Sequence, residues 1–370
     1  MQIVGCPREI KKQENRVALT PSGSRQLTRN GVRVLIEKGA GSGADYEDAE
    51  YERAGAEIAP DARTVFERAD VVIKVKEPQP SEIAMLGKGQ TLFTYLHLAA
   101  NKDLTETLVA TGVTAIAYET IEVGPRLPLL EPMSEVAGRM SVLVGAYYLA
   151  KHEGGRGTLL GGVPGVLPGR VTIIGGGTCG VNAAKVATGI GAETTILELS
   201  SERMTWLDTA MPAARTVYSS EAALLDLLPA TDLLVGAVLV PGARAPKLVT
   251  RDMLQLMRPG TVAVDIAVDQ GGCIETTRPT THENPIFTEE GVIHYCVANM
   301  PGAYARTSTQ ALTNVTLPYI QLLATHELKD ACSRNPELIG GINCTAGKLT
   351  CPEVGAAHGI TVSEAVTAID

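Results

Sequence analysis

The chain has 370 residues, more than one hydrophobic core usually serves, so two domains with a cleft between them are expected. Its 45% hydrophobic and 20% charged residues are typical of a globular protein. A net charge of −9 without a basic run argues against nucleic-acid or acidic-membrane partners. Apolar runs such as Val142–Ala150 are shorter than the roughly 18 residues of a membrane span, and the N-terminus lacks a secretory pattern. We therefore expect a cytoplasmic protein.

Seven cysteines are scattered without a repeated spacing, which favours a reducing compartment over a disulfide framework. Cys332, Cys344, Cys351 and His358 lie near one another in the C-terminal tail, but no C-x-x-C pair supports a zinc site. The sequence favours free thiols and predicts no bound metal.

The N-terminal part alternates short apolar strands with helical segments such as Ser22–Asn30 and Lys102–Thr111, a pattern typical of a parallel sheet. The expected strands are Ile3–Gly5, Val32–Ile36, Val71–Val75, Leu92–Leu96 and Ala115–Tyr118. A long helix over Ser134–His152 follows Pro132 and is expected to cross into a second domain.

A second series of strands follows, and the helix predicted over Thr307–His326 would return the chain to the first domain. These strands are Arg170–Ile174, Thr194–Leu199, Leu233–Val238, Thr261–Ile266 and Val292–Val297. The predicted fold is α/β, with two doubly wound parallel-sheet domains joined by long helices around a cleft. Residues 1–130 plus 306–370 would form a discontinuous substrate domain, and residues 131–305 a Rossmann dinucleotide-binding domain.

The prediction of a dinucleotide site depends on an apolar strand that is followed by Gly175-x-Gly177-x-x-Gly180 and then by a helix. The three glycines would allow a tight turn, close approach of a pyrophosphate and close helix packing. The helix N-terminus would offer N–H groups to the anion. The next strand ends in Glu198, about 20 positions further on, where a carboxylate would meet a ribose hydroxyl. The alternative is an ordinary glycine-rich turn with Glu198 solvated.

Catalytic candidates come from the carboxyl ends of strands, where ligands of open α/β sheets bind. Lys76 leaves its strand closer to the expected cleft than Lys74, although a terminal lysine can simply reach solvent. His97 ends the next strand as a general acid or base, or as a core histidine bonded to the backbone. Arg16, in a polar loop after the first strand, would grip a carboxylate bidentately or be solvated.

Asp269 is the catalytic candidate of the second domain, because it lies just beyond the strand Thr261–Ile266. A carboxylate there would face the same crevice and balance an imidazole and a lysine. It would equally suit the start of a turn before Gly271.

At these residues the chain resembles the alanine dehydrogenases, within the wider group that includes nicotinamide nucleotide transhydrogenase soluble domains. The resemblance covers roughly residues 1–320, and the tail beyond about 330 matches loosely. The matching segments are Pro7-Arg-Glu-Ile-Lys through Pro21, Val75-Lys-Glu-Pro78, Thr94-Tyr-Leu-His-Leu-Ala-Ala100, Pro132 to Arg139, Gly154 to Gly157, Gly162 to Val166, Gly236 to Gly242, Asp265 to Gly272 and Val297 to Pro301.

The resemblance implies reversible, NAD-dependent oxidative deamination of L-alanine to pyruvate and ammonium by a protein that commonly forms homohexamers. Arg16 and Lys76 would bind substrate, with His97, Asp269 and Lys76 as the catalytic residues. Family members usually have aspartate at the position of Glu198. The residues implied to contact the cofactor are Ser134, Gly175, Gly177, Thr178, Cys179, Gly180, Glu198, Arg203, Ser220, Val238, Leu239, Ile266, Asp269, Asn299 and Met300.

Two other functions are compatible with a dinucleotide site. The chain would bind NADH for a membrane-embedded transhydrogenase and use no small substrate, or it would sense a nucleotide without turnover. The joint presence of Arg16, Lys76 and His97 favours the enzyme. Glu198 predicts a preference for NAD, because the additional phosphate of NADP would meet a like charge.

Overall fold

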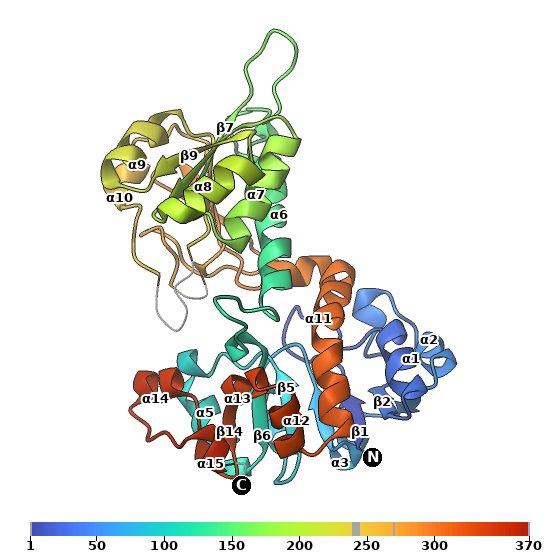
Figure 1. Ribbon diagram of the computed structural model, residues 1–370. Coiled ribbons are helices and arrows are strands. Elements are labelled where there is room, and N and C mark those ends of the chain that lie inside the picture. Colours follow the sequence, from blue (N-terminus) through green and yellow to red (C-terminus); the bar gives the residue numbers. More distant parts are fainter. Residues whose placement is uncertain (1, 239–244, 269–270, 369–370) are drawn as a thin grey trace. The chain divides into compact units, whose positions relative to one another are not determined.

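The computed structural model describes residues 2–238, 245–268 and 271–368, and the chain divides into two compact units (Figure 1). Unit 1 comprises Met1–Met133 and Tyr304–Asp370, and unit 2 comprises Ser134–Ala303. The chain leaves unit 1 within α6 (Glu131–Tyr148) and re-enters it just before α11 (Ala305–Thr325). These are the two long helices predicted from the sequence. Helix α6 begins earlier than predicted because Pro132 lies in its first turn, where a missing N–H is tolerated.

The sheet of unit 1 has the strand order β15-β14-β6-β5-β4-β1-β2-β3. Strands β1 to β6 pair in parallel in the order 3-2-1-4-5-6 that is typical of doubly wound folds. Strands β14 and β15 extend the sheet antiparallel beyond β6. The strands are β1 (Ile3–Cys6), β2 (Arg33–Glu37), β3 (Glu57–Ala59), β4 (Val71–Ile73), β5 (Thr91–Thr94), β6 (Thr114–Ala117), β14 (Ile342–Thr345) and β15 (Lys348–Leu349).

Side-chain caps fix where several helices of unit 1 begin. Thr20, Asp61 and Asn101 each accept a hydrogen bond from a backbone N–H in the first turn of the following helix. The helices are α1 (Pro21–Arg29), α2 (Asp48–Arg53), α3 (Ala62–Arg68), α4 (Pro80–Ile83), α5 (Lys102–Thr111), α12 (Leu328–Arg334), α13 (Glu337–Gly341), α14 (Pro352–His358) and α15 (Ala365–Ala368), with short 3-10 turns η1 (Ser42–Ala44), η2 (Leu98–Ala100) and η3 (Tyr118–Thr120).

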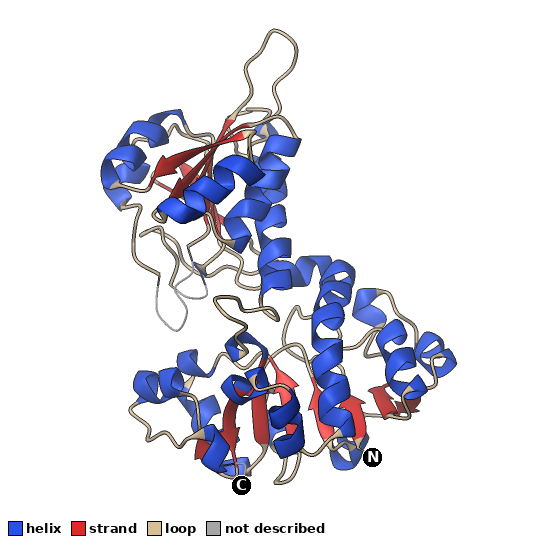
Figure 2. Cartoon of the chain, viewed as in Figure 1, coloured by secondary structure: helices blue, strands red, loops and turns tan. Residues whose placement is uncertain are grey.

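The parallel strands of unit 2 are arranged as in unit 1, within a sheet of order β12-β13-β11-β10-β7-β8-β9. Only β12 pairs antiparallel among the described strands of this sheet. Figure 2 shows helices beside the strands of each unit. The elements are β7 (Arg170–Ile174), β8 (Glu193–Glu198), β9 (Ala214–Tyr218), β10 (Leu233–Gly236), β11 (Val262–Asp265), β12 (Ile286–Glu289), β13 (Val292–Tyr295), α7 (Thr178–Gly189), α8 (Ser201–Ala210), α9 (Glu221–Leu227), α10 (Arg251–Leu254), η4 (Lys151–Glu153), η5 (Leu228–Ala230) and η7 (Met300–Tyr304).

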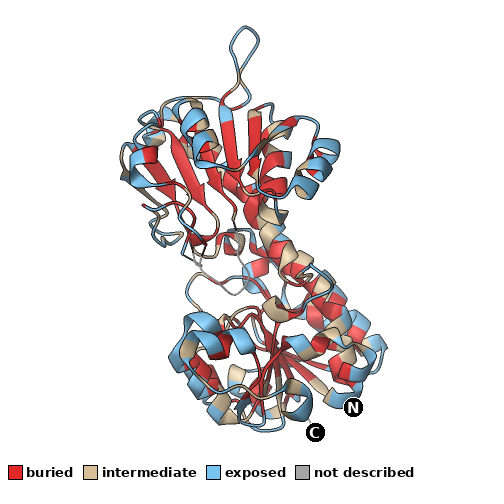
Figure 3. Cartoon of the chain, turned by 60° about the vertical axis from the view of Figure 1, so that its left-hand side comes forward, coloured by how far each residue is buried: buried red, intermediate tan, exposed pale blue. Residues whose placement is uncertain are grey.

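The central strands are buried on both faces (Figure 3). In β4, Val71 and Ile73 pack into one apolar cluster while Val72 packs into another. In β11, Val264 and Ala263 likewise belong to different clusters. Because helices cover both faces of a parallel sheet, its strands are continuous apolar runs, which explains why the sequence revealed them.

The α/β class and the doubly wound arrangement are confirmed, but the sheets are mixed rather than purely parallel. Strands β3, β9 and β12 were not predicted because they lie at sheet edges and carry exposed or half-buried residues. Strand β14 is buried but contains asparagine and threonine, so it lacks an apolar run. The cysteines are free. No helix within the described ranges has the length and apolar character needed to cross a membrane.

Candidate active site

The three candidates of unit 1 follow the carboxyl ends of neighbouring parallel strands. Arg16 follows β1, Lys76 follows β4 and His97 follows β5. The strand order reverses between β1 and β4, which is the switch point where open α/β sheets bind ligands. The fold therefore places these side chains beyond the carboxyl ends of the central strands, where ligand binding is expected.

Arg16 is almost completely buried, at 2% exposure, and Glu14 holds its guanidinium. The Nε and Nη2 atoms of Arg16 donate to the two carboxylate oxygens of Glu14 at 2.6 and 2.5 Å, and Nη1 lies 3.0 Å from the sulfur of Met133. Burial alone would lower the pKa of Arg16, but the ion pair with Glu14 outweighs burial and raises it. The result is a rigid, permanently charged guanidinium.

Lys74 and Lys76 have contrasting surroundings. The Nζ of Lys74 lies 3.1 Å from Glu9 and 2.7 Å from Glu82, and all three side chains are buried. Burial alone would lower the pKa of Lys74, but these two carboxylates raise it. Burial lowers the pKa of Lys76, and the positive charges of Arg16 and Lys11 lower it further. The preference for Lys76 over Lys74 as the reactive lysine therefore has a physical basis.

His97 sits in a left-handed backbone conformation, with φ +50° and ψ +38°. Its N–H donates to the Glu119 carboxylate at 2.6 Å, and the carboxylate lies 4.0 Å from the ring Nδ1. The ring stacks on Tyr95 with 5.9 Å between centroids. Its side chain is 37% exposed, so it is not the core histidine of the alternative hypothesis. The imidazole is thus oriented and accessible to a ligand.

The C-terminal segment reaches the turn that carries His97. Helix α14 contacts η2, and the Nε2 of His358 lies 2.7 Å from the carbonyl oxygen of Leu98. The same oxygen accepts a hydrogen bond from Thr105 at 3.1 Å. The tail therefore supports the candidate site structurally, a role that the sequence did not predict.

The glycine loop of unit 2 has the geometry of a phosphate-binding turn. Gly175 has φ +99°, and a Cβ on Gly180 would lie 1.8 Å from the carbonyl oxygen of Gly175. Only glycine fits at Gly180 because that oxygen belongs to the backbone. A Cβ on Gly177, the residue before α7, would meet nothing within 4 Å. The backbone at Gly177 is therefore open to a ligand at the start of a helix.

Glu198 and Arg203 both bind this loop. The Glu198 carboxylate accepts hydrogen bonds from the backbone N–H groups of Gly176, Leu199 and Ser200, at 2.8, 2.7 and 2.9 Å. The Nε of Arg203 donates to the carbonyl oxygen of Gly176 at 2.7 Å. The Glu198 carboxylate, at the end of β8, is therefore hydrogen-bonded to the glycine loop.

The other predicted cofactor residues of unit 2 also cluster beyond the carboxyl ends of its parallel strands. Ser220 follows β9 and caps α9, Val238 follows β10, Ile266 follows β11, and Asn299 follows β13 with φ +98°. Leu239 and Asp269 lie outside the described residues. Of the remainder, Thr178 and Cys179 begin α7, Ser134 is half-buried in α6, and Met300 is buried.

Asp265 is a buried carboxylate that sequence reasoning missed. It ends β11 and accepts hydrogen bonds from the N–H groups of Ala267 and Ile274 and from the hydroxyl of Thr277, at 3.2, 3.2 and 2.9 Å. Burial raises the pKa of Asp265. These bonds tie together the two ends of the segment that contains Asp269. An aspartate inside an apolar strand run was the available signal.

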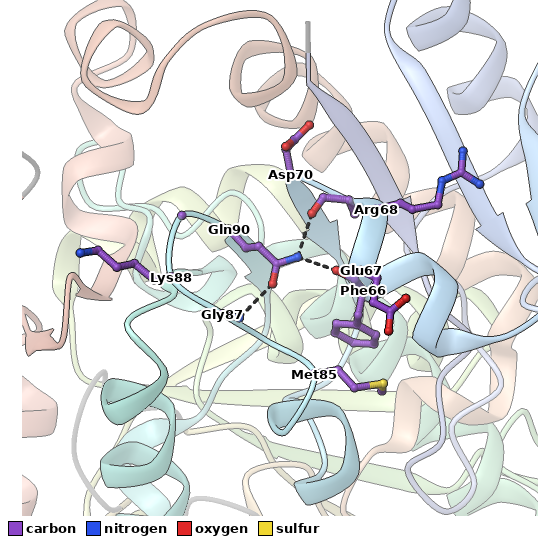
Figure 4. A pocket seen from close by; sticks show the side chains of 10 residues that line it. Phe66, Glu67, Arg68, Asp70, Met85, Gly87, Lys88 and Gln90 are labelled. Atoms are coloured by element: carbon purple, nitrogen blue, oxygen red, sulfur yellow. Dashed lines mark hydrogen bonds between the residues drawn. The ribbon is translucent and has the colours of Figure 1, made fainter.

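A separate depression in unit 1 lies at the opposite ends of the strands. Its lining includes Asp70 and Gln90, which directly precede β4 and β5 (Figure 4). The Gln90 amide donates to the carbonyl oxygens of Phe66 and Ala69 at 2.6 and 2.8 Å. The depression is therefore away from the candidate residues, and this central side chain is already engaged.

Family models match both parts of the chain. The model "Alanine dehydrogenase/PNT, N-terminal domain" matches residues 5–137, and "Alanine dehydrogenase/PNT, C-terminal domain" matches residues 141–352. The chain belongs to the alanine dehydrogenase/PNT family. This confirms the resemblance seen in the sequence motifs.

Known proteins match along nearly the whole chain. The alanine dehydrogenase of Halomonas elongata is 53% identical over 99% of each chain. A solved L-alanine dehydrogenase structure is 50% identical, covers 96% of this chain and 99% of its own, and has a TM-score of 0.93. A transhydrogenase structure from Sinorhizobium meliloti covers 95% and 99%, with 24% identity and a TM-score of 0.81, and shares the fold.

Proposed function

We propose that the chain catalyses the reversible NAD-dependent oxidative deamination of L-alanine to pyruvate and ammonium. The observation that carries the proposal is the presence of Arg16, Lys76 and His97 at one sheet edge, in a chain about half identical to alanine dehydrogenases along its length. Unit 1 would be the substrate domain, close to the expected residues 1–130 plus 306–370. Unit 2 would be the nucleotide domain, close to residues 131–305.

Substrate binding would begin with the carboxylate shared by alanine and pyruvate. Arg16 offers a buried cation that Glu14 keeps in one orientation, which favours a directed ion pair with a carboxylate. Lys76 would donate to the substituent on the reacting carbon, the carbonyl oxygen in the case of pyruvate. Holding the substrate at two points would leave its Cα hydrogen in a defined direction.

The residues of unit 2 fit a dinucleotide. The open space at Gly177 suits a pyrophosphate, and Glu198 ends β8 where a ribose hydroxyl would donate to it. The site residues would be the predicted set, from Ser134 to Met300, with Leu239 and Asp269 among them. When bound, the nicotinamide supplies the chemistry of accepting or returning a hydride.

His97 would act as the general acid–base catalyst. Loss of a hydride from alanine would leave an iminium ion. Neutral His97 would take a proton from water as the water adds to the iminium carbon, and Lys76 with Asp269 would stabilise the resulting carbinolamine oxygen until ammonia leaves. Glu119 holds the backbone N–H of His97, and Tyr95 supports the ring. These contacts would fix the direction of proton transfer.

The activity is tested by measuring NADH formation with purified protein across L-amino acids, including alanine, serine and glycine. Turnover with alanine supports the proposal. Binding of NADH without turnover of any amino acid would instead favour the transhydrogenase component or a nucleotide sensor. The same assay with pyruvate and ammonium tests the reverse reaction.

His97→Ala should lower turnover by about 10²–10⁴-fold, the usual contribution of general acid–base catalysis. The affinity for NADH should remain unchanged, because His97 and the glycine loop belong to different units. His152→Ala is the matched control, since His152 is 73% exposed in η4. Turnover within about threefold of the unmodified protein would remove His97 from the mechanism.

A further inference from the structure

Lys74 bridges two glutamates beside the segment that carries Lys76. Its Nζ lies 3.1 Å from Glu9 and 2.7 Å from Glu82, and these three residues, which form the Lys74 cluster, are at most 9% exposed. Removing their charges from water costs free energy that apolar side chains of similar volume would not incur. None of the three takes part in the proposed chemistry, so their role lies elsewhere.

The other carboxylate oxygens of the Lys74 cluster hold two backbone N–H groups. Glu9 accepts a hydrogen bond from the N–H of Val75 at 2.6 Å, and Glu82 accepts one from the N–H of Gln79 at 2.7 Å. These N–H groups lie on either side of the segment 76–78. The cluster therefore holds the chain at both ends of this segment, and its central lysine joins the two attachments.

The backbone of Lys76 lies outside the regular sheet. Strand β4 ends at Ile73, and Lys76 lies in a bend beyond it. Its carbonyl oxygen accepts a hydrogen bond from the hydroxyl of the buried Thr94, in β5, at 2.9 Å. Together with the two attachments of the Lys74 cluster, this bond fixes the backbone from which the Lys76 side chain extends.

We propose that the Lys74 cluster positions Lys76, by holding the backbone on both sides of it so that its amino group keeps one place beyond the carboxyl ends of the strands. The inference rests on the proposed function, in which Lys76 donates to the substrate. A misplacement of about 1 Å can cost 10²-fold in rate. The cluster should resist such movement, because shifting the segment would leave buried charged groups without their partners.

Three variants of the full-length protein each weaken one attachment of the segment 76–78: Glu9→Gln, Glu82→Gln and Thr94→Val. The rate at which acetic anhydride labels Lys76, followed by mass spectrometry across a range of pH, gives the pKa of this amine without substrate or cofactor. Burial lowers that pKa, so a loosened segment that lets the amine reach water should raise it.

The direction of the change separates movement from electrostatics. Glu9→Gln and Glu82→Gln each remove a negative charge, which by itself would lower the pKa of Lys76. A rise in these variants therefore reports movement of the lysine. Thr94→Val changes no charge and little volume, so it tests the same movement through the hydrogen bond to the backbone of Lys76 alone.

The kinetic effect should follow the same movement. We expect each variant to lower kcat/KM for pyruvate by about tenfold or more. Gln90→Met is the control for lost stability, because the Gln90 amide donates to the carbonyl oxygens of Phe66 and Ala69 at the opposite ends of the strands. It should lower the melting temperature of the protein and leave both the pKa of Lys76 and kcat/KM unchanged.

The proposal is overturned if the pKa of Lys76 stays constant or falls in the glutamine variants, or if Gln90→Met lowers kcat/KM as much as they do. If neither glutamine variant folds, Thr94→Val decides by the same two measurements. Absence of turnover by the unmodified chain would overturn the proposed function, whereas the labelling of Lys76 would still show whether the Lys74 cluster holds it in place.

Discussion

Two lysines separated by one residue show how surroundings determine the role of a side chain. Lys74 lies between Glu9 and Glu82, whose charges raise its pKa, so it remains a structural cation. Lys76 is half-buried, and its pKa is lowered by partial burial and by the positive charges of Arg16 and Lys11. A lysine with a lowered pKa can lose its proton at a pH where ordinary lysines remain charged. The two residues therefore differ in chemistry although they share a residue type and a strand end.

Lys11→Gln should move the alkaline limb of the pH profile of kcat/KM for pyruvate to higher pH. In the proposed mechanism Lys76 must be protonated to donate to the substrate oxygen, so activity should fall as pH rises through its lowered pKa. Lys11 is one of the cations that lower this pKa, and it also pairs with Glu77, whose charge raises it. Replacing Lys11 removes a positive charge that lowers the pKa of Lys76 and leaves the negative charge of Glu77 without its ion pair. Both changes raise the pKa of Lys76. Lys12→Gln is the control for net charge, and an unchanged limb in Lys11→Gln would contradict the argument.

The sequence located the strand-end residues of unit 1 but not their partners. Arg16, Lys76 and His97 were found because each follows an apolar run. Glu119 binds the backbone of a residue 22 positions away, and Glu9 binds a lysine 65 positions away. Such pairs depend on which strands become neighbours in the sheet, and a single sequence does not contain that information directly. Glu14 is only two residues from Arg16, so this ion pair could have been predicted from neighbouring residues in the sequence.

At the scale of elements, two glycines of the same loop should respond differently to replacement by alanine. Gly177→Ala should fold with an unchanged melting temperature but weaken NADH binding by about tenfold or more, because its methyl group would occupy the open space in which we propose that the pyrophosphate lies. Gly180→Ala should destabilise unit 2 by several kcal/mol, since its Cβ would overlap the backbone of Gly175. Thermal unfolding and NADH titration distinguish the two effects.

Gly189→Ala provides the control for both variants. Gly189 lies in the last turn of the same helix, α7, and a Cβ there meets nothing within 4 Å. Replacing glycine by alanine within a helix favours folding slightly. Tight NADH binding by Gly177→Ala, comparable with that of Gly189→Ala, would show that Gly177 does not face the cofactor.

At the scale of the whole molecule, an apolar hairpin projects from unit 2 as the green loop beyond β7 in Figure 1. Its side chains Leu159, Val163, Val166 and Leu167 are 67, 53, 63 and 85% exposed. Exposed apolar residues gathered on one projection are typical of a contact surface. We propose that this hairpin is a contact surface in the homohexamer that the family resemblance implies.

The variant Leu159→Asp/Leu167→Asp should reduce the assembly to smaller species, as measured by light scattering during gel filtration. Charged groups at these positions would have to be desolvated in a subunit contact. Glu202→Lys/Asp208→Lys, exposed positions on α8, is the control for charge changes elsewhere on unit 2. A double-aspartate variant with the mass of the unmodified protein would exclude the hairpin from the assembly.

Much of the architecture was predictable because buried parallel strands leave a direct signature in the sequence. The two repeated strand series and the long helices α6 and α11 were recognised from apolar runs and helix-start residues. Edge strands such as β9 and β12 were not, because half-exposed strands lack that signature. The extension of the unit 1 sheet by β14 also required the folded chain, since β14 pairs with β6 more than 200 residues earlier.

That pairing has a consequence for synthesis on the ribosome. Strand β6 emerges with the N-terminal part of the chain, whereas β14, which covers its edge, emerges near the end. Until then β6 presents unpaired backbone groups, which can recruit a strand from another nascent chain. The hydroxyls of Thr114 and Thr345, 2.8 Å apart, mark where this edge is finally closed. Unit 2, which is contiguous in sequence, can complete its own sheet before β14 is available to pair with β6.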